Sequence, residues 1–457
     1  MGSRGSGERI ETTRLREFIV LTGSGCLNIG LKQGDRIGMV KLRFMGGTHE
    51  VGRNAILVES DEAHLLLDYG VKIGEEPQFP EHVRARDVDG IVVAHAHLDH
   101  SGGVPLFYLT ERKPFFATPV TVELMRVLIR DFIKLSGYFL QFEYIELENM
   151  MRNRRDLSYG VEEKVRNINF MLLDAGHIPG SAMVDITSGG KRILYTGDMN
   201  TLRTRLVNGA KVPKGRFDAV IIESTYSTQD HPDRQALENV FINEINDVIN
   251  EDGRVLVPAF AVGRSQEMLS IIHAHKLRTN VYVDGMARKV NQIYTENPDF
   301  MRAPKAFMSA LSKTREIRGW RDRREAVKRV GVIVAPSGML QGGTAMFYME
   351  RLALNESNGV FLVSFQVPGT GGAQLLETGR FPIKDREEKV RARVRHFDFS
   401  SHSGKTQLEE FLMGLKGKPN IYVIHGEPES CDALAQWVRD ELDLNAVAPN
   451  QGDEFQV

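Results

Sequence analysis

Apolar runs that end in polar residues recur along the chain. Each run is rich in leucine or β-branched residues, and each leads into a side chain that can bind a metal, with a glycine close behind. Runs of this kind are typical of short buried strands, and the glycine indicates a turn after the strand. The pattern therefore predicts strands whose ends carry metal-competent residues. These residues are Asp68 in LLLDYG, His177 in LLDAGHIPGS, Asp198 in RILYTGD and His425 in NIYVIHGE.

A further apolar run, IVVA at 91–94, leads into HAHLDH at 95–100. In an extended segment alternate side chains share a face, so His95 and His97 point the same way. Asp99 and His100 can turn toward a second point about one turn onward. A lone histidine is most often an ordinary surface or core residue, but this density is not typical of that. Because a zinc site takes nitrogen, oxygen or sulfur ligands in a tetrahedral arrangement, the segment favours two metals with further ligands from elsewhere.

The type of periodicity changes twice along the chain. Residues 39–227 alternate short β-rich runs with glycine turns, whereas 228–391 alternate strands with helical stretches, as in GRVLVPAF followed by RSQEMLSIIHAHKL. This alternation predicts a parallel α/β sheet, inserted into a first domain that residues 392–457 complete. We expect the active site in the cleft between the two domains. Residues 1–38 show no strong periodicity and are treated as an extension or leader of uncertain status.

The composition is that of an ordinary globular protein. The 457 residues are enough for two domains with substantial cores, and 42% are hydrophobic and 26% charged. No run approaches the roughly 18 to 20 apolar residues of a membrane span, and FIVL at 18–21 is too short for a signal-peptide core. We therefore expect a reducing, cytoplasmic setting. Cys26 and Cys431 have no cysteine or histidine neighbour at zinc-ligand spacing and are interpreted as structural.

The net charge of −2 alone argues against a nucleic-acid-binding protein. The segment 302–330, however, holds ten Lys or Arg residues against three acidic ones. Such residues neutralise phosphates and give an affinity that depends on salt but not on sequence. The alternative interpretation is a solvated helical face. If the substrate is a phosphodiester, the segment predicts contacts with it, and the candidates are Arg321, Arg323 and Arg324.

The motifs together resemble the metallo-β-lactamase superfamily. HAHLDH and the downstream His177, Asp198 and His425 match its metal-binding motifs in order. Glu223 in IIESTY, His402 in FDFSSHSG and His425 in VIHGE are similar to the three extra motifs of its nucleic-acid-processing β-CASP family. VPAFAVGRSQE, VDGMA and APSGMLQGG also resemble segments of that family. The chain looks most like archaeal relatives, without KH domains, of the nuclease subunit of the cleavage-and-polyadenylation machinery.

This resemblance implies an α/β fold class: a metallo-β-lactamase αββα sandwich with an inserted β-CASP α/β domain. It implies a centre of two zinc ions, although a site of histidine and aspartate alone stays open to iron or manganese. Asp68 would orient a ligating histidine rather than bind a metal. His402 would act as general acid, and Glu223 would fix its tautomer and raise its pKa. The first zinc would be held by His95, His97 and His177, the second by Asp99, His100 and His425, and Asp198 would bridge them.

The implied activity is that of a metal-dependent ribonuclease, which hydrolyses single-stranded RNA with a hydroxide formed between two zinc ions, in RNA processing, 3′-end maturation or decay. A five-prime exoribonuclease of the RNase J type is an alternative on the same motifs. A thioester or lactam hydrolase would lack the 228–391 insertion. A non-catalytic scaffold subunit would need some defect other than a missing ligand position. A homodimer is compatible with the resemblance, but no coiled-coil or apolar helical stripe requires it.

Overall fold

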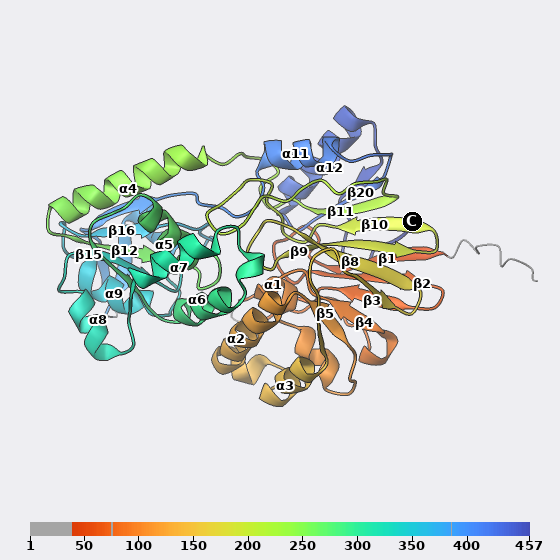
Figure 1. The fold of residues 1–457 in the computed structure, drawn as a ribbon, viewed down its shortest axis with the longest axis horizontal. Coiled ribbons are helices and arrows are strands. Elements are labelled where there is room, and N and C mark those ends of the chain that lie inside the picture. Colours follow the sequence, from red (N-terminus) through yellow and green to blue (C-terminus); the bar gives the residue numbers. More distant parts are fainter. Residues whose placement is uncertain (1–38, 75, 385) are drawn as a thin grey trace, which may run out of the picture. The chain divides into compact units, whose positions relative to one another are not determined.

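The metal-competent motifs lie on two layers of β-sheet. The computed structural model describes residues 39–74, 76–384 and 386–457, so the segment 1–38 and Cys26 lie outside the described residues. The strand order is β22-β1-β2-β3-β4-β5-β6 in one sheet and β21-β20-β11-β10-β9-β8-β7 in the other (Figure 1). The first sheet comprises β1 (Val40–Gly46), β2 (Ala55–Ser60), β3 (His64–Leu67), β4 (Gly90–Val92), β5 (Phe115–Ala117), β6 (Arg154–Asp156) and β22 (Glu454–Gln456). The second comprises β7 (Glu162–Val165), β8 (Ile168–Asp174), β9 (Ala182–Ser188), β10 (Lys191–Tyr195), β11 (Ala219–Glu223), β20 (Asn420–Ile424) and β21 (Ala446–Val447).

Apolar side chains from the facing sides of the two sheets form one core, in which Leu42 and Ile193 are fully buried. Because successive side chains of a strand point to opposite faces, the outer face of each sheet needs its own cover. Leu124 of α2 is buried against the first sheet, and Leu434 of α12 against the second. This αββα arrangement confirms the predicted fold class. Its helices are α1 (Leu98–Ser101), α2 (Pro119–Ser136) and α3 (Tyr144–Arg152) on one side, and α11 (Lys405–Met413) and α12 (Pro428–Leu442) on the other.

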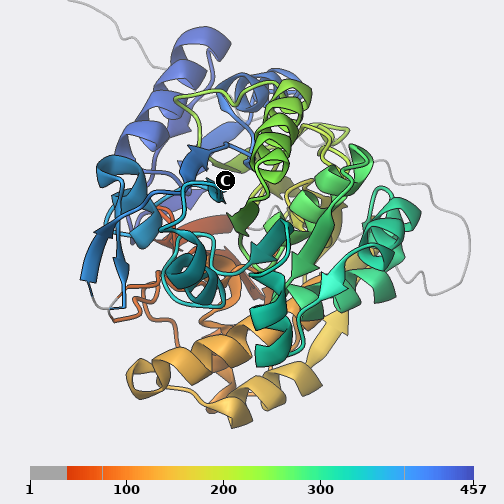
Figure 2. The same cartoon turned by 90° about the vertical axis from the view of Figure 1, so that its left-hand side faces the viewer.

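Between β11 and α11 the chain forms a second α/β domain. Its sheet has the order β14-β13-β15-β12-β16-β19, and neighbouring strands are parallel throughout, as the alternation of strands and helices predicts. Both faces of a parallel sheet need cover, and Phe241 of α4 and Tyr348 of α9 are buried in the clusters on its two faces. Figure 2 views this domain from its outer side. In none of the described ranges does a helix have the length and apolar character to cross a bilayer.

The strands of the inserted domain are β12 (Arg254–Pro258), β13 (Asn280–Val283), β14 (Arg315–Glu316), β15 (Gly331–Ala335), β16 (Gly359–Leu362) and β19 (Arg393–His396), with a separate hairpin of β17 (Arg380–Ile383) and β18 (Arg386–Lys389). The helices are α4 (Arg234–Asn250), α5 (Arg264–Ala274), α6 (Ala287–Glu296), α7 (Pro304–Ser312), α8 (Trp320–Ala326), α9 (Ala345–Leu352) and α10 (Gly371–Thr378).

The inserted sheet extends further along the chain than the predicted boundary at 391. The edge strand β19 falls in the segment expected to return to the first domain, yet it pairs with β16, with Val394 opposite Val360. Its sequence RVRH is mostly polar, so it carries little of the apolar signal from which the other strands are predicted. Nε2 of His396, at its end, lies 3.1 Å from the carbonyl oxygen of Ser364, and within the described ranges this ring forms no hydrogen bond to a metal-competent side chain.

The basic segment around α8 is partly used inside the inserted domain. Arg323 donates hydrogen bonds to both carboxylate oxygens of Asp284, at 2.7 and 3.2 Å. Asp284 is 1% exposed and also accepts from the Tyr348 hydroxyl. Arg321 and Arg324 are exposed, and Figure 1 shows α8 on the side of the domain away from the sandwich. An internal ion pair therefore accounts for Arg323, and of the three predicted RNA contacts only Arg321 and Arg324 remain available.

Replacing Arg323 with methionine should lower the free energy of unfolding by about 2 kcal/mol, less than the ~3–5 kcal/mol of a fully buried pair because Arg323 is partly exposed. The loss arises because Asp284 stays buried without its cation. Arg321→Met, which removes the same charge from an exposed position, should leave stability within ~0.5 kcal/mol of wild type. Denaturant unfolding of the two variants measures the difference. If the two variants were equally stable and only Arg323→Met bound RNA more weakly, Arg323 would be a contact for RNA rather than a part of the fold.

Candidate metal centre

Strand ends from both sheets meet at one rim of the sandwich, and the metal-competent side chains lie there. β3 and β4 run parallel, as do β10, β11 and β20, so within each sheet their carboxyl ends share an edge. Asp68 directly follows β3 and adopts a φ of 57°, and His425 directly follows β20 with a φ of 51°. Such positive φ values are uncommon outside glycine and cluster at functional sites. They turn the chain sharply where each strand ends.

The first group of ligand atoms comes from His95, His97, His177 and Asp198. His97 Nδ1 lies 3.0 Å from His95 Nε2 and 3.3 Å from His177 Nε2. Asp198 Oδ2 lies 3.4 Å from His95 Nε2 and 3.8 Å from His177 Nε2. A tetrahedron with bonds of about 2.0–2.1 Å to a metal has edges of roughly 3.3 Å. The spacing of these atoms therefore suits one tetrahedral cation.

The second group comes from Asp99, His100, Asp198 and His425. Asp198 Oδ1 lies 3.0 Å from His100 Nε2 and 3.2 Å from His425 Nδ1. His425 Nε2 lies 3.4 Å from Asp99 Oδ2. Asp198 thus presents one carboxylate oxygen to each group, and the two groups share this one residue.

The chemistry of this cluster fits divalent cations. Burial lowers the pKa of His95, His97 and His177, which keeps the three rings neutral, as ligation requires. Burial would raise the pKa of Asp198, but the facing histidines, His100 first among them, lower it well below its usual range. Asp198 Oδ1 is buried and accepts no hydrogen bond from the described residues, so its position suits a cation better than a donor. A set of nitrogen and oxygen ligands without sulfur suits several first-row divalent metals.

Asp68 orients His100 by binding the ring nitrogen that faces away from the cluster. It is fully buried, and its carboxylate lies 2.7 Å from His100 Nδ1 while accepting hydrogen bonds from the Ala94 amide at 2.7 Å and the Tyr195 hydroxyl at 2.5 Å. Since Nδ1 is engaged with Asp68, Nε2 of His100 faces the cluster. Asp68 therefore fixes both a ring and the strand end that leads into HAHLDH.

His402 approaches the cluster from the return segment. Its Nδ1 lies 3.0 Å from both oxygens of Glu223, which also accepts a hydrogen bond from the Met199 amide. Burial would lower the pKa of His402, but the carboxylates of Glu223 and Asp198 outweigh it and raise the pKa to about 9. Nε2 then points toward the centre, 3.9 Å from Asp198 Oδ2. At this position Nε2 can either donate a proton or bind a cation.

Three contacts of the cluster were not predicted from the sequence. The Tyr195 hydroxyl binds Asp68, the Thr225 hydroxyl binds Glu223, and the Ser401 carbonyl lies 2.9 Å from His177 Nδ1. Each of the three residues lies within the motif of another candidate, in RILYTGD, IIESTY and FDFSSHSG. Their position beside predicted site residues is the one sign in the sequence that they belong to the site. Which groups their hydroxyl and carbonyl oxygens contact depends on the fold and cannot be predicted from the spacing of residues along the chain.

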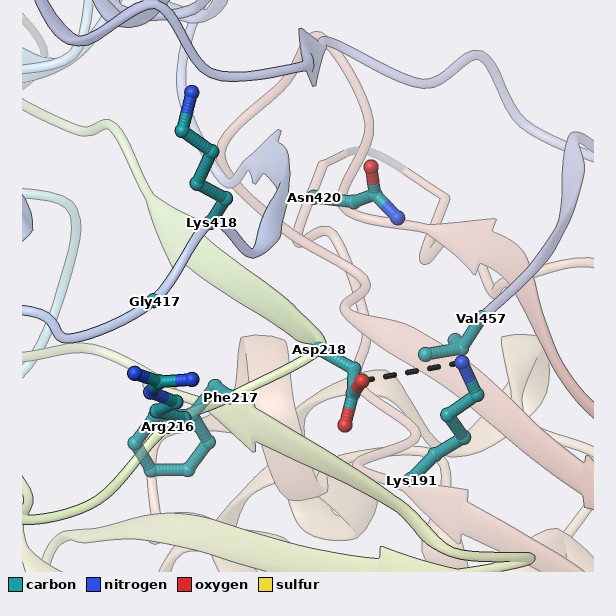
Figure 3. A pocket seen from close by; sticks show the side chains of 8 residues that line it. All are labelled: Lys191, Arg216, Phe217, Asp218, Gly417, Lys418, Asn420 and Val457. Atoms are coloured by element: carbon teal, nitrogen blue, oxygen red, sulfur yellow. Dashed lines mark ion pairs between the residues drawn. The ribbon is translucent and has the colours of Figure 1, made fainter.

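A cavity lies away from this rim. It has a volume of about 320 Å³ and is lined by Val457 and by residues at or before the starts of β10, β11 and β20, so it lies at the ends of those three strands opposite to the metal centre (Figure 3). Lys191 pairs there with Asp218 at 3.9 Å. None of its lining residues is a histidine, and Asp218 is its only carboxylate side chain. The cavity therefore offers no second metal centre.

Three family models match consecutive parts of the chain. The model described as metallo-beta-lactamase superfamily matches residues 50–225, the Beta-Casp domain matches 265–375, and the Zn-dependent metallo-hydrolase RNA specificity domain matches 387–449. The first and third matches carry the ligand residues and His402. The second covers most of the inserted sheet.

Full-length comparisons agree with these matches. The chain is 37% identical to "RNase aCSPSF2" of Saccharolobus solfataricus over 91% of this chain and 85% of that protein. It is 31% identical to "Transcription termination factor FttA" of Lokiarchaeum sp. over 90% of this chain and 70% of that protein. A solved structure of a protein of unknown function from Enterococcus faecalis V583 matches with a TM-score of 0.59 at 15% identity, covering 92% of this chain and 100% of the other. At that identity the likeness concerns the fold alone.

Replacing Asp68 with asparagine should weaken divalent metal binding by about 10- to 100-fold, the usual effect of losing the partner that orients a ligating histidine. Tyr195→Phe removes one hydrogen bond to Asp68 but leaves the contact with His100 intact, so its effect should be several-fold smaller. Competition with a chromophoric chelator measures both affinities. Equal metal affinity in Asp68→Asn and wild type would contradict an orienting role for Asp68.

Proposed function

Because the chain belongs to the β-CASP family of the metallo-β-lactamase superfamily, we propose that it is a ribonuclease that hydrolyses phosphodiester bonds of single-stranded RNA with the help of bound metal. The observation that carries the proposal is the meeting of two ligand groups at Asp198, with the His402–Glu223 pair on the same rim. The match to an RNA specificity domain and the similarity to a chain named RNase aCSPSF2 support RNA as the substrate. The similarity to a termination factor favours RNA 3′-end formation or decay as its setting.

We assign two zinc ions to the centre. When bound, such a pair supplies Lewis acidity and lowers the pKa of water to near neutrality. Asp198 carries the charge that holds the two sites together, and it is 2% exposed, so bulk water does not compete for it. One zinc would be held by His95, His97 and His177, the other would be held by Asp99, His100 and His425, and Asp198 belongs to both groups of ligand atoms.

His402 is proposed as the general acid. Because Glu223 engages Nδ1, the proton available to substrate is the one on Nε2, which faces the centre. Transfer of this proton to the departing 3′ oxygen of the RNA leaves a 3′-hydroxyl end. Glu223 holds the tautomer and stabilises the charged ring before the transfer.

A scaffold role without catalysis is less well supported. Scaffold relatives in such families have lost ligands, whereas both groups here are complete, and only His97 and Asp99 among their residues are partly exposed. Contacts with parts of the RNA that lie away from the metal centre are proposed for Arg321 and Arg324, which are exposed on α8.

The purified chain should hold about two transition-metal ions, as expected for a two-metal hydrolytic centre. His100→Ala should lose the metal of one group, whereas Asp198→Ala should lose both because both groups use its carboxylate. Elemental analysis of the purified proteins measures this. A wild-type content near one ion, or an Asp198→Ala content equal to that of His100→Ala, would contradict a shared carboxylate.

Replacing His402 with alanine should leave both metals bound and slow RNA cleavage by roughly 10²- to 10⁴-fold, the usual contribution of a positioned general acid. His100→Ala is the matched comparison, because it should lower metal content and rate together. Glu223→Gln should give a smaller loss of rate than His402→Ala, with full metal content.

Single-turnover cleavage and metal content are measured on the same samples. The double variant of Glu223 and His402 should be little slower than His402→Ala, because groups that act as one unit are not additive. Loss of metal in His402→Ala would identify Nε2 as a ligand. An unchanged rate would remove His402 from the mechanism.

A further inference from the structure

An arginine of the inserted domain lies beside the loop that carries the ligand His177, which we call the metal loop. Arg264 is the first residue of α5 and follows Gly263, which adopts a φ of 78°. A Cβ atom on Gly263 would lie 2.8 Å from Cγ2 of Ile178, and Ile178 directly follows His177. This close approach of the Gly263 backbone to the Ile178 side chain places Arg264 near the ligand His177, and both residues line one cavity.

Arg264 forms no ion pair with the residues that the structure describes. Its Nε is buried without a hydrogen-bond partner, and its guanidinium forms no ion pair within 4.0 Å. The Nε of the neighbouring Arg234 also lacks a partner among the described residues, but Arg234 pairs with Glu267 through Nη2 at 2.7 Å. Glu267 also accepts from the amides of Arg205 and Leu206, so both of its carboxylate oxygens are engaged within the fold.

The other carboxylate in this region is also engaged. Asp398 pairs with His231 at 2.7 Å. Burial, and then the charge of Arg234, lower the pKa of Arg264 to about 10, so its guanidinium is still charged at neutral pH. A largely buried cation without a partner is costly, and here the surplus charge lies next to the metal centre.

A small cavity connects this charge to the centre. Arg264 and Arg234 line it together with His177, Ser401 and Glu267, and its volume is about 20 Å³. The Glu267 carboxylate is paired with Arg234, so Arg264 supplies the unpaired charge of the lining. That is room for about one water-sized group, such as one oxygen of a phosphate. An anionic oxygen in the cavity would lie among the side chains of Arg264, Arg234 and His177.

We propose that Arg264 binds a backbone phosphate of the RNA beside the metal centre. The inference rests on the proposed ribonuclease function and names the residue that positions its substrate. A planar guanidinium can bind two phosphate oxygens at once. The phosphate would thus supply the ion-pair partner that Arg264 lacks within the described fold. Arg234 is paired with Glu267 inside the fold, whereas the charge of Arg264 is available to pair with the substrate.

Equilibrium binding of a labelled single-stranded RNA tests the proposal, with the metal-loaded full chain and a His402→Ala background that slows cleavage. Arg264→Met should weaken binding about tenfold, the typical loss of a hydrogen bond to a charged group. The slope of log affinity against log salt should fall by about 0.7, the value for one phosphate contact in a single strand. Arg264→Lys should fall between, and Arg391→Met, which removes an exposed arginine, should match the parent. An Arg264→Met protein with parental affinity and slope would overturn the proposal.

Thermal unfolding separates this proposal from the proposed function. Arg264→Met should melt at or above the wild-type temperature, because it removes a charge that has no partner. Inorganic phosphate should stabilise wild type more than Arg264→Met, whether or not the chain cleaves RNA. A lower melting temperature without phosphate, or equal stabilisation of both proteins by phosphate, would show that Arg264 serves the fold instead. If wild type neither binds nor cleaves RNA while the phosphate difference holds, the ribonuclease assignment fails, and only anion binding by Arg264 stands.

Discussion

The buried carboxylate of Asp198 is the constraint on which the rest of the site depends. It is nearly inaccessible to water, and neutral or charged imidazoles surround it on two sides. A buried carboxylate is stable only if it is paired or binds metal. Five histidines and Asp99 converge on it from strand ends that lie far apart in sequence. The ends of β4, β8, β10 and β20 must therefore coincide at one rim, and Asp68 holds that rim by binding both His100 and the Ala94 amide.

The inserted domain completes the site rather than merely covering it. Tyr294 of α6 is buried in the same core cluster as α2 of the first domain, and Gly263 touches the metal loop at Ile178. The chain then returns through His402 and His425. The proposed acid and one ligand therefore lie after the insertion in the chain, in the segment that returns to the first domain. This arrangement brings Arg264 to the centre, whereas α8 and its basic residues lie on the outer side (Figure 1).

Local patterns in the sequence were enough for the strand-and-ligand arrangement and for the parallel inserted sheet. The resemblance to a known family supplied the grouping of the ligands, which the structure brings together in the same two sets. The sequence could not reveal that Arg323 pairs with Asp284, because that contact spans 39 residues and depends on how α8 packs. The polar edge strand β19 lacked an apolar signal. The sequence could not indicate Arg264 either, because what distinguishes it is the lack of an ion-pair partner within the described fold.

The chemical nature of the ends left by RNA cleavage is the most direct test of a water-attack mechanism at this centre. A single-stranded RNA labelled at either end is incubated with the metal-loaded chain, with the chain after chelation, and with the chelated chain after zinc is restored. Attack by water with protonation of the 3′ oxygen predicts 5′-phosphate and 3′-hydroxyl ends, lost on chelation and regained with zinc. Products ending in a 2′,3′-cyclic phosphate, or cleavage indifferent to chelation, would contradict the account, because the attack would then come from the RNA itself and would not need the centre that Asp198 holds together.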